Sequence, residues 1–266
     1  MAVFVSALSL TPVKGTRLRS AKRIELTEDG ARGDRALFVV DARDRMVNGK
    51  QLGELQSVVA DLDADAHTLA LTFADGSCAS AELRYGDPLT ARFFSELYPA
   101  RELIGPWAQA LSEQLGQPLR IVAPEIQAVD RGREGAASII SRASLQHLAG
   151  VAEQPSVDAR RFRMLIEIDG VDAHVEDSWV GRQLVVGEAT LLVQGNVGRC
   201  LVTSREPESG VIDLPTLDLL GSYRRDVDST EPLPFGIYAR VLVPGAVRVG
   251  DSVSADGTAD ARLRRS

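Results

Sequence analysis

The amino-acid sequence predicts a mainly β fold of the α+β class, built from two β-rich, barrel-like subdomains with a few short helices. Three observations lead to this prediction. Short apolar runs separated by turn residues fill roughly the first hundred positions, only three segments show helical signals, and short apolar runs return after residue 160. Short strands at close spacing, each bounded by turn residues, are typical of β barrels and sandwiches.

The first third of the chain reads as a meander of strands. Its apolar start, "MAVFVSALSLTPVKG", has no positively charged region before the apolar run, which favours a first strand over a signal peptide. "RALFVVDARDRMV" (35–47) then reads as strand, turn and strand, and the same pattern continues through 57–77 and 78–94. These segments predict an N-terminal β-rich unit.

The first helix is predicted within "GPWAQALSEQLGQP" (105–118). Trp107, Leu111 and Leu115 fall on one helical face, and Pro106 suits the first helical position. Gly116 is a typical helix end, because glycine adopts the left-handed backbone found there without a steric penalty.

The second half contains two more helices and a second set of strands. Ser141 is a plausible N-cap for a helix over 141–150, and Asp213 for one over 214–225. A polar segment without periodicity, "PEIQAVDRGREGAA", separates the halves, so we expect domains at 1–123 and 124–256, followed by a flexible tail at 257–266. The strands expected in the second half lie at 161–169, 182–187, 189–194, 200–204 and 237–243.

Composition excludes several classes of partner. The formal net charge of −7 argues against nucleic acid, because phosphate backbones attract basic surfaces. No uninterrupted apolar window reaches the ~18 residues of a membrane span, so we expect no membrane partner. The two cysteines, Cys78 and Cys200, lie far apart and do not resemble a disulfide framework, which favours a cytoplasmic location.

Cys200 is the candidate centre of any chemistry. It stands in "GNVGRCLVTSREPESG" (195–210), after a glycine-rich turn and directly after Arg199. A nearby cation favours the thiolate form, and thiolate is a soft ligand for transition metals. A small buried side chain in a strand is the other interpretation of such a cysteine, and the residues alone leave both open.

Basic residues near strand ends could form an anion site. Lys14 closes the first strand region and Arg35 opens the run after the Gly33–Asp34 turn. Alternation in a strand over 161–168 would place Arg161 and Arg163 on one face. If such residues converged they could hold phosphate, although each alone would be an ordinary surface charge.

Several motifs along the sequence resemble those of the MOSC family, which is named for the C-terminal domain of molybdenum cofactor sulfurases. The likeness is to the branch with an N-terminal β barrel, which includes the amidoxime-reducing components. It extends in order over nearly the whole chain. The motifs that carry it are "TPVKG", "GDRALFVVD", "FRMLIEI", "EDSW", "RCLVTSREPESG", "TLDLLGSYR" and "PFGIYARV".

The resemblance implies a domain assignment and a cofactor. Residues 1–123 would be the N-terminal MOSC β-barrel domain and 124–256 the MOSC domain. Cys200 would be the catalytic residue and the ligand of molybdenum in a molybdenum–pyranopterin cofactor. Family-level binding of pyridoxal phosphate is a further possibility. The residues that would bind the cofactor are Lys14, Gly15, Arg35, Arg163, Gly198, Arg199 and Tyr238.

The chain departs from the family pattern at several polar positions. Gly15 and Gly198 stand where the family often has serine, and Leu165 replaces an asparagine. A Thr-Ser pair of the family corresponds to Glu134 and Gly135. Side-chain hydrogen bonds to the cofactor would therefore be missing, so either backbone groups replace them or the cofactor binds more weakly.

The function implied by the resemblance is a molybdenum-dependent oxidoreductase that reduces N-hydroxylated small molecules. Because the sequence has no cysteine cluster for iron–sulfur and no dinucleotide motif, a separate flavoprotein or iron–sulfur protein should supply electrons. Two alternatives remain. Cys200 could carry a persulfide in sulfur transfer, or the protein could bind the cofactor without turnover.

Overall fold

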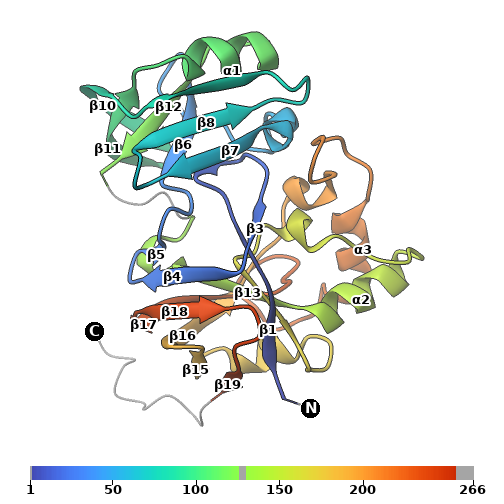
Figure 1. The fold of residues 1–266 in the computed structure, drawn as a ribbon. Coiled ribbons are helices and arrows are strands. Elements are labelled where there is room, and N and C mark those ends of the chain that lie inside the picture. Colours follow the sequence, from blue (N-terminus) through green and yellow to red (C-terminus); the bar gives the residue numbers. More distant parts are fainter. Residues whose placement is uncertain (1, 126–129, 256–266) are drawn as a thin grey trace.

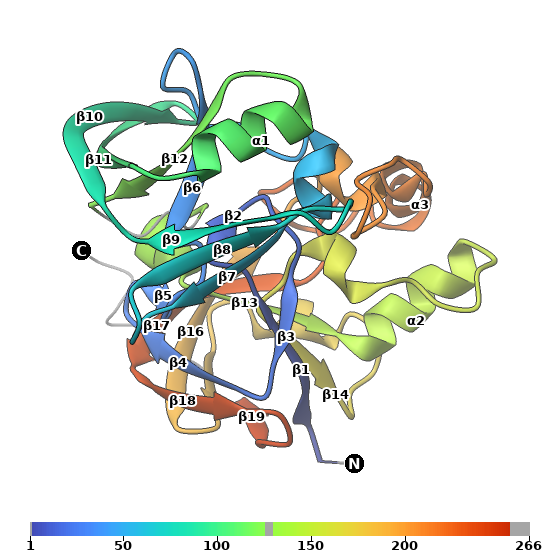
Figure 2. The ribbon, with the colours of Figure 1, turned by 45° about the horizontal axis from the view of Figure 1, so that its top comes forward.

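The fold is known from a computed structural model that describes residues 2–125 and 130–255. Two β-rich parts lie one above the other in Figures 1 and 2, with helix α1 at the outer side of the upper part. The described residues form four β-sheets and three α-helices. The expected mainly β, α+β fold is therefore confirmed. The expected tail, 257–266, lies outside the described residues.

An eight-stranded sheet forms the centre of the lower part. It is antiparallel except where β13 and β14 pair in parallel, with Ile139 opposite Ile166. Its inner face packs buried Val, Leu and Ile side chains from every strand but β3 into one core. In sheet order the strands are β19 (Val253–Ala255), β15 (Gln183–Val186), β16 (Ala189–Asn196), β17 (Ile237–Val243), β13 (Ala137–Ser141), β14 (Ile166–Asp169), β1 (Phe4–Leu10) and β3 (Arg19–Ala21).

The upper part contains two smaller sheets around a second core. Trp107 of α1 is fully buried there, and its indole N–H donates to the Leu69 carbonyl at 3.0 Å. One sheet has the order β10 (Tyr85–Phe93), β11 (Glu96–Leu103), β12 (Leu119–Pro124), β6 (Leu37–Asp41) and β2 (Val13–Lys14). The other has the order β7 (Val59–Asp63), β8 (Thr68–Thr72) and β9 (Cys78–Glu82).

The N-terminal strands cross from one part to the other. β1 pairs with β14, so that Leu8 lies opposite Ile166. The fourth sheet joins β4 (Arg23–Thr27) to β18 (Gly245–Arg248) on one side and to β5 (Gly30–Ala31) on the other. The expected division near residue 123 stays a prediction, and these pairings extend across it.

The helices follow their predicted signals, with small shifts at the ends. Helix α1 spans Trp107–Leu115, with Pro106 at the N-cap position and Gly116 in the left-handed conformation at its end. Helix α2 spans Arg142–Val151, and the Ser141 side chain caps it by accepting from the Ser144 N–H. Helix α3 spans Thr216–Tyr223. Its N-cap is Pro215, so the predicted Asp213 cap is wrong; Asp213 instead forms an ion pair with Arg161 at 2.6 Å.

Short 3-10 helices replace the first part of the strand predicted at 161–169 and the whole strand predicted at 200–204. Residues 161–165 are not extended: helix η3 spans Ala159–Phe162, Arg163 is left-handed with φ 54°, and β14 begins only at Ile166. Residues 200–204 are not a strand either, because Cys200 precedes helix η5 (Leu201–Ser204). The three other 3-10 helices are η1 (Gly53–Ser57), η2 (Gly132–Gly135) and η4 (Val175–Trp179).

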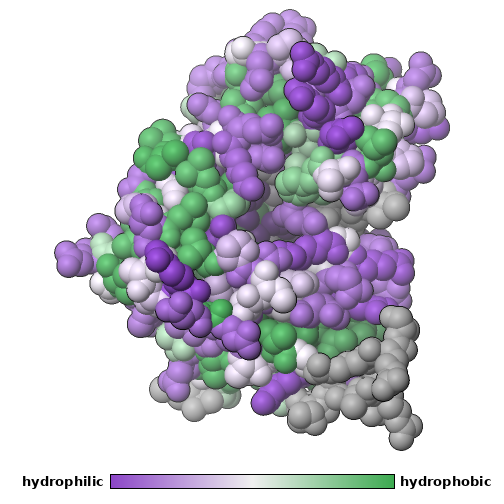
Figure 3. Space-filling view, turned by 180° about the vertical axis from the view of Figure 1, so that it is seen from behind, coloured by the Kyte–Doolittle hydropathy of each residue, from purple (hydrophilic) through white to green (hydrophobic). Residues whose placement is uncertain are grey.

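The face shown in Figure 3 is mainly hydrophilic, with patches of apolar residues. Among exposed apolar side chains, Leu201, Val211 and Ile212 follow Cys200 in sequence. Within the part of the chain that the structure describes, no helix has the length and apolar character needed to cross a bilayer.

Candidate functional site

All the site residues predicted from the sequence line one cavity of about 450 Å³. This volume lies in the range of small-molecule and cofactor pockets. Both parts of the fold contribute to its walls, including Asn48 and Gln56 from the upper part and Ser138 and Thr203 from the lower part. The predicted residues that line it are Lys14, Gly15, Arg35, Arg163, Gly198, Arg199, Cys200 and Tyr238.

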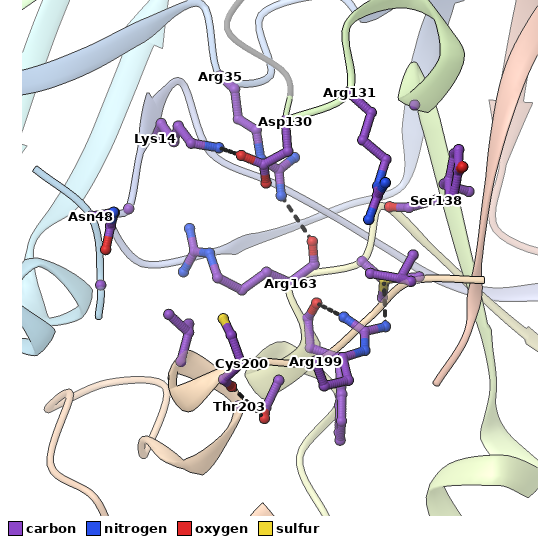
Figure 4. Close-up of a pocket in the computed structure, with 18 of the residues that line it drawn as sticks. Lys14, Arg35, Asn48, Asp130, Arg131, Ser138, Arg163, Arg199, Cys200 and Thr203 are labelled. Carbon is purple, nitrogen blue, oxygen red and sulfur yellow. Dashed lines mark hydrogen bonds and ion pairs between the residues drawn. The ribbon is translucent and has the colours of Figure 1, made fainter. Parts of the chain in front are cut away.

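The basic residues form one side of the cavity. In Figure 4, Lys14 and Arg35 approach from above, and the Arg163 guanidinium lies between them and the Cys200 sulfur. The Arg35 guanidinium donates to the Arg163 carbonyl at 2.8 Å, and the Arg163 guanidinium donates to the Thr16 carbonyl at 2.7 Å. Residues from three separate segments are thus brought together, as an anion site requires.

Local backbone bonds fix Lys14 and Arg35 in place. Strand β2 pairs in parallel with β6, which sets Lys14 opposite Phe38. The Arg35 N–H donates to the Thr11 carbonyl at 2.7 Å, and the Thr11 N–H donates to the Asp34 carboxylate at 2.9 Å. Arg35 has a positive φ of 50°, so these bonds hold an unusual backbone conformation.

Buried positive charge exceeds buried negative charge on this side. Lys14 is paired with Asp130, and Arg35 with Asp34, but Arg163 has no ion pair within the described part of the chain. Burial, and then repulsion from Arg35, lowers the pKa of Arg163 to about 10. Burial also lowers the pKa of Lys14 against the opposing effect of Asp130. A bound anion would relieve this repulsion.

Cys200 lies on the opposite side, in a loop that its neighbours hold firmly. The loop follows β16, and the N–H groups of Val197 and Arg199 donate to the carbonyls of Gly236 and Pro232. The Cys200 carbonyl accepts from the Thr203 hydroxyl at 2.9 Å and from its N–H at 3.0 Å. Cys200 is a free, partly exposed thiol, and its sulfur points toward the Arg163 guanidinium (Figure 4).

The Arg199 guanidinium is committed to the protein itself. It donates to the Phe235 carbonyl at 2.7 Å and to the Phe162 carbonyl at 3.1 Å. Burial lowers its pKa to about 9, although the nearby Cys200 opposes this. We expected this guanidinium to line the cofactor, and that stays a prediction. Its hydrogen bonds to these two carbonyls fasten the cysteine loop to two neighbouring segments.

Tyr238 forms part of a third wall that includes residues the sequence analysis missed. The Arg131 guanidinium stacks over the Tyr238 ring, with its carbon 4.4 Å from the ring centroid. Arg131 is also paired with Glu231 at 2.8 Å. Asp130 and Arg131 lie in the polar segment without periodicity, where no sequence signal marks them.

The two glycine departures have physical causes. Gly15 has a φ of 95°, a conformation that favours glycine. At Gly198, an added Cβ would lie 2.6 Å from the Glu231 carboxylate and 3.1 Å from the Pro232 carbonyl. A serine at position 15 would therefore strain the backbone, and a serine at position 198 would displace the Glu231 side chain. At the third departure, the Leu165 N–H donates to the Ser138 hydroxyl at 3.0 Å.

Two protein-family models match this chain, one in each half. The model for the MOSC N-terminal beta barrel domain matches residues 2–116, and the model for the MOSC domain matches residues 127–254. The chain belongs to the MOSC family.

Named relatives of this MOSC protein are amidoxime-reducing components. Mitochondrial amidoxime-reducing component 1 of mouse is 28% identical over 94% of this chain and 81% of its own length. The human protein of the same name is 29% identical over 94% of this chain and 82% of its length. Among solved structures, the YUAD protein of Bacillus subtilis is 14% identical, with a TM-score of 0.44 over 95% of this chain and 94% of its own.

Proposed function

We propose that this MOSC protein is a molybdenum-cofactor-dependent oxidoreductase that reduces N-hydroxylated small molecules. The observation that carries the proposal is the cavity described above, in which one thiol faces three cations from separate segments of the chain. The substrate class is supported by the names of the relatives, which are amidoxime-reducing components. A soft thiolate suits molybdenum, and clustered cations suit the cofactor's phosphate.

The residues present fit such a cofactor. Lys14, Arg35 and Arg163 would hold its phosphate, whose charge would balance the excess of buried positive charge. Cys200 would be the protein's ligand to the metal. When bound, the cofactor would supply two-electron oxygen-atom transfer chemistry. The chain would orient it, and Arg199 would keep the cysteine loop in place.

The proposed reaction requires an external electron source. The substrate's N–O bond breaks, and the nitrogen compound takes up two electrons and two protons to give an N–H group and one water molecule. A separate flavoprotein or iron–sulfur protein would deliver the electrons. A cytoplasmic location stays a prediction beside relatives whose names are mitochondrial.

The deciding experiment compares Cys200→Ser with Cys78→Ser after expression in a host that makes the cofactor. We expect wild-type protein to contain molybdenum and pterin in equal amounts. Cys200→Ser should keep much of the pterin and lose reductase activity, because the anion site survives and the soft ligand does not. Cys78→Ser, which removes the other, exposed cysteine, should behave as wild type.

Two results would count against the proposal. Wild-type protein without molybdenum and pterin would exclude it. A reductant-sensitive sulfur adduct on Cys200, found without bound metal, would favour sulfur transfer instead.

A further inference from the structure

Gln56 is an unexplained polar side chain in the wall of the cavity. It lies in η1 and is only 1% exposed, yet among the residues that the structure describes neither its amide nitrogen nor its amide oxygen has a hydrogen-bond partner. It is also one of the residues that line the cavity. Buried amides are nearly always hydrogen-bonded in native proteins, because losing water without replacement costs free energy.

Hydrogen bonds hold the backbone around Gln56, and the side chain itself is buried. The Arg17 N–H donates to the Val58 carbonyl at 2.9 Å, and the Arg17 guanidinium donates to the Gln56 carbonyl at 3.3 Å. The adjacent Thr16 carbonyl accepts from the Arg163 guanidinium. Gln56 therefore borders the same chain segment that fixes the anion side of the cavity.

We propose that Gln56 is a ligand-recognition residue whose carboxamide binds the heterocyclic amide edge of a pterin. A carboxamide presents a donor and an acceptor side by side, and the pyrimidinone ring of a pterin presents the complementary acceptor and donor. The inference rests on the proposed function and adds a contact for the ring to those for phosphate and metal. None of the sequence motifs points to this residue.

The pairing also accounts for the polar contacts that the chain lacks. Gly15, Leu165 and Gly198 offer no side-chain hydrogen bond to a ligand. A paired donor and acceptor at Gln56 supplies two such bonds from the opposite part of the fold. The upper part would thus contribute ring recognition as well as Lys14 and Arg35.

The test measures molybdopterin binding to cofactor-free protein for Gln56→Met and Gln56→Glu. Gln56→Met keeps the length of the side chain and removes both hydrogen-bonding groups. We expect its affinity for molybdopterin to fall about tenfold to a hundredfold. Gln56→Glu keeps the shape but removes the donor and adds a negative charge, so its affinity should fall at least as far. Gln109→Leu, an exposed change in α1, is the control.

Two further measurements separate recognition from structural support. The thermal midpoint of cofactor-free Gln56→Met should equal or exceed that of wild type, because an amide without a partner contributes no stability. Stabilisation of the cofactor-free protein by inorganic phosphate should persist in Gln56→Met and disappear in Arg163→Asn.

Each other outcome overturns the inference in a recognisable way. Unchanged molybdopterin affinity in both Gln56 variants shows that water satisfies the amide, while the proposed function stands. Loss of the phosphate response in Gln56→Met shows that the amide acts only through the cations. If wild-type protein binds no molybdopterin, the proposed function fails and this inference fails with it.

Discussion

Arg163 shows how one residue can serve both fold and site. Its left-handed backbone turns the chain between η3 and β14, and its carbonyl accepts from Arg35 while its guanidinium donates to Thr16. If Arg163 lay in an extended strand, alanine could replace it without affecting the fold. Because its backbone is left-handed, a residue that tolerates this conformation is the better substitution for testing the side chain.

We expect Arg163→Asn to reduce cofactor affinity by about tenfold to a hundredfold with little loss of stability. Asparagine tolerates the left-handed backbone. The lost hydrogen bond to Thr16 is offset by removal of a buried cation that Arg35 repels, so the main loss is one charge-assisted contact to the phosphate. Arg163→Ala should lose the same affinity and also about 1 kcal/mol of stability, since alanine resists this conformation. Calorimetric titration and thermal unfolding check both. Full cofactor affinity in Arg163→Asn would show that the arginine is not part of the anion site.

At the scale of elements, three of them meet in a cluster of rings away from the cavity. His174 precedes η4, and its ring centroid lies 5.2 Å from that of His147 in α2 and 5.7 Å from that of Tyr223 in α3. Its Nε2 atom is buried and has no hydrogen-bond partner within residues 2–125 and 130–255. Burial, with help from Arg224 and His147, lowers the pKa of His174 to about 4.

We expect the pH dependence of stability to reveal this histidine. The unfolded chain, with a histidine pKa near 6.5, binds more protons than the folded chain between about pH 4 and pH 6.5. The free energy of unfolding should therefore fall as pH drops through this range, by about 1–2 kcal/mol after allowance for partial exposure. His174→Asn should flatten this slope in denaturant titrations. His67→Asn, at an exposed position that is also left-handed, is the control for the substitution itself.

Local signals explain which elements the sequence could predict. Helices α1 and α2 were recognisable because Gly116 and Ser141 act within their own turns. The segments at η3 and η5 were mistaken for strands because their apolar alternation suits a strand. Their actual conformation depends on distant partners, such as the Arg199 guanidinium that holds the Phe162 carbonyl. The spacing of residues in the sequence does not predict a hydrogen bond between groups 37 positions apart.

The site was more predictable than its details. Motif resemblance brought Lys14, Arg163 and Cys200 to attention, and the structure places them in one cavity. Gln56 and Arg131 were missed, because a glutamine before a serine and an arginine in a polar segment are ordinary surface patterns. The burial of its amide marks Gln56 as a site residue, and the contact with the Tyr238 ring marks Arg131.

At the scale of the molecule, the cavity depends on how the upper and lower parts meet. The loop after η5 contacts η1, and the Arg205 guanidinium donates to the Gly210 carbonyl at 2.6 Å. Gly210 has a φ of 75°, and an added Cβ would lie 1.9 Å from the Gly53 carbonyl oxygen. Close backbone contact therefore joins the two parts beside Gln56.

We expect Gly210→Ala to lower the free energy of unfolding by about 3 kcal/mol or more, and to reduce cofactor retention. The change adds a clash with Gly53 to the ordinary strain of a left-handed alanine. Gly76→Ala isolates that strain, because Gly76 has a φ of 84° with open space around it. It should cost only about 1–2 kcal/mol. Equal losses in both variants would show that the contact between the parts does not matter.

The N-terminal strands pair with strands from much later in the chain, which determines when the fold can form during synthesis. Leu8 pairs with Ile166, and Ile24 pairs with Val247, so the first strands leave the ribosome long before their partners exist. At about 5–20 residues per second, the chain between Ile24 and its partner takes roughly 10–45 s to make. Tyr238 appears almost as late. The cavity is therefore complete only after Tyr238 has been made, and any cofactor must enter after that point of synthesis.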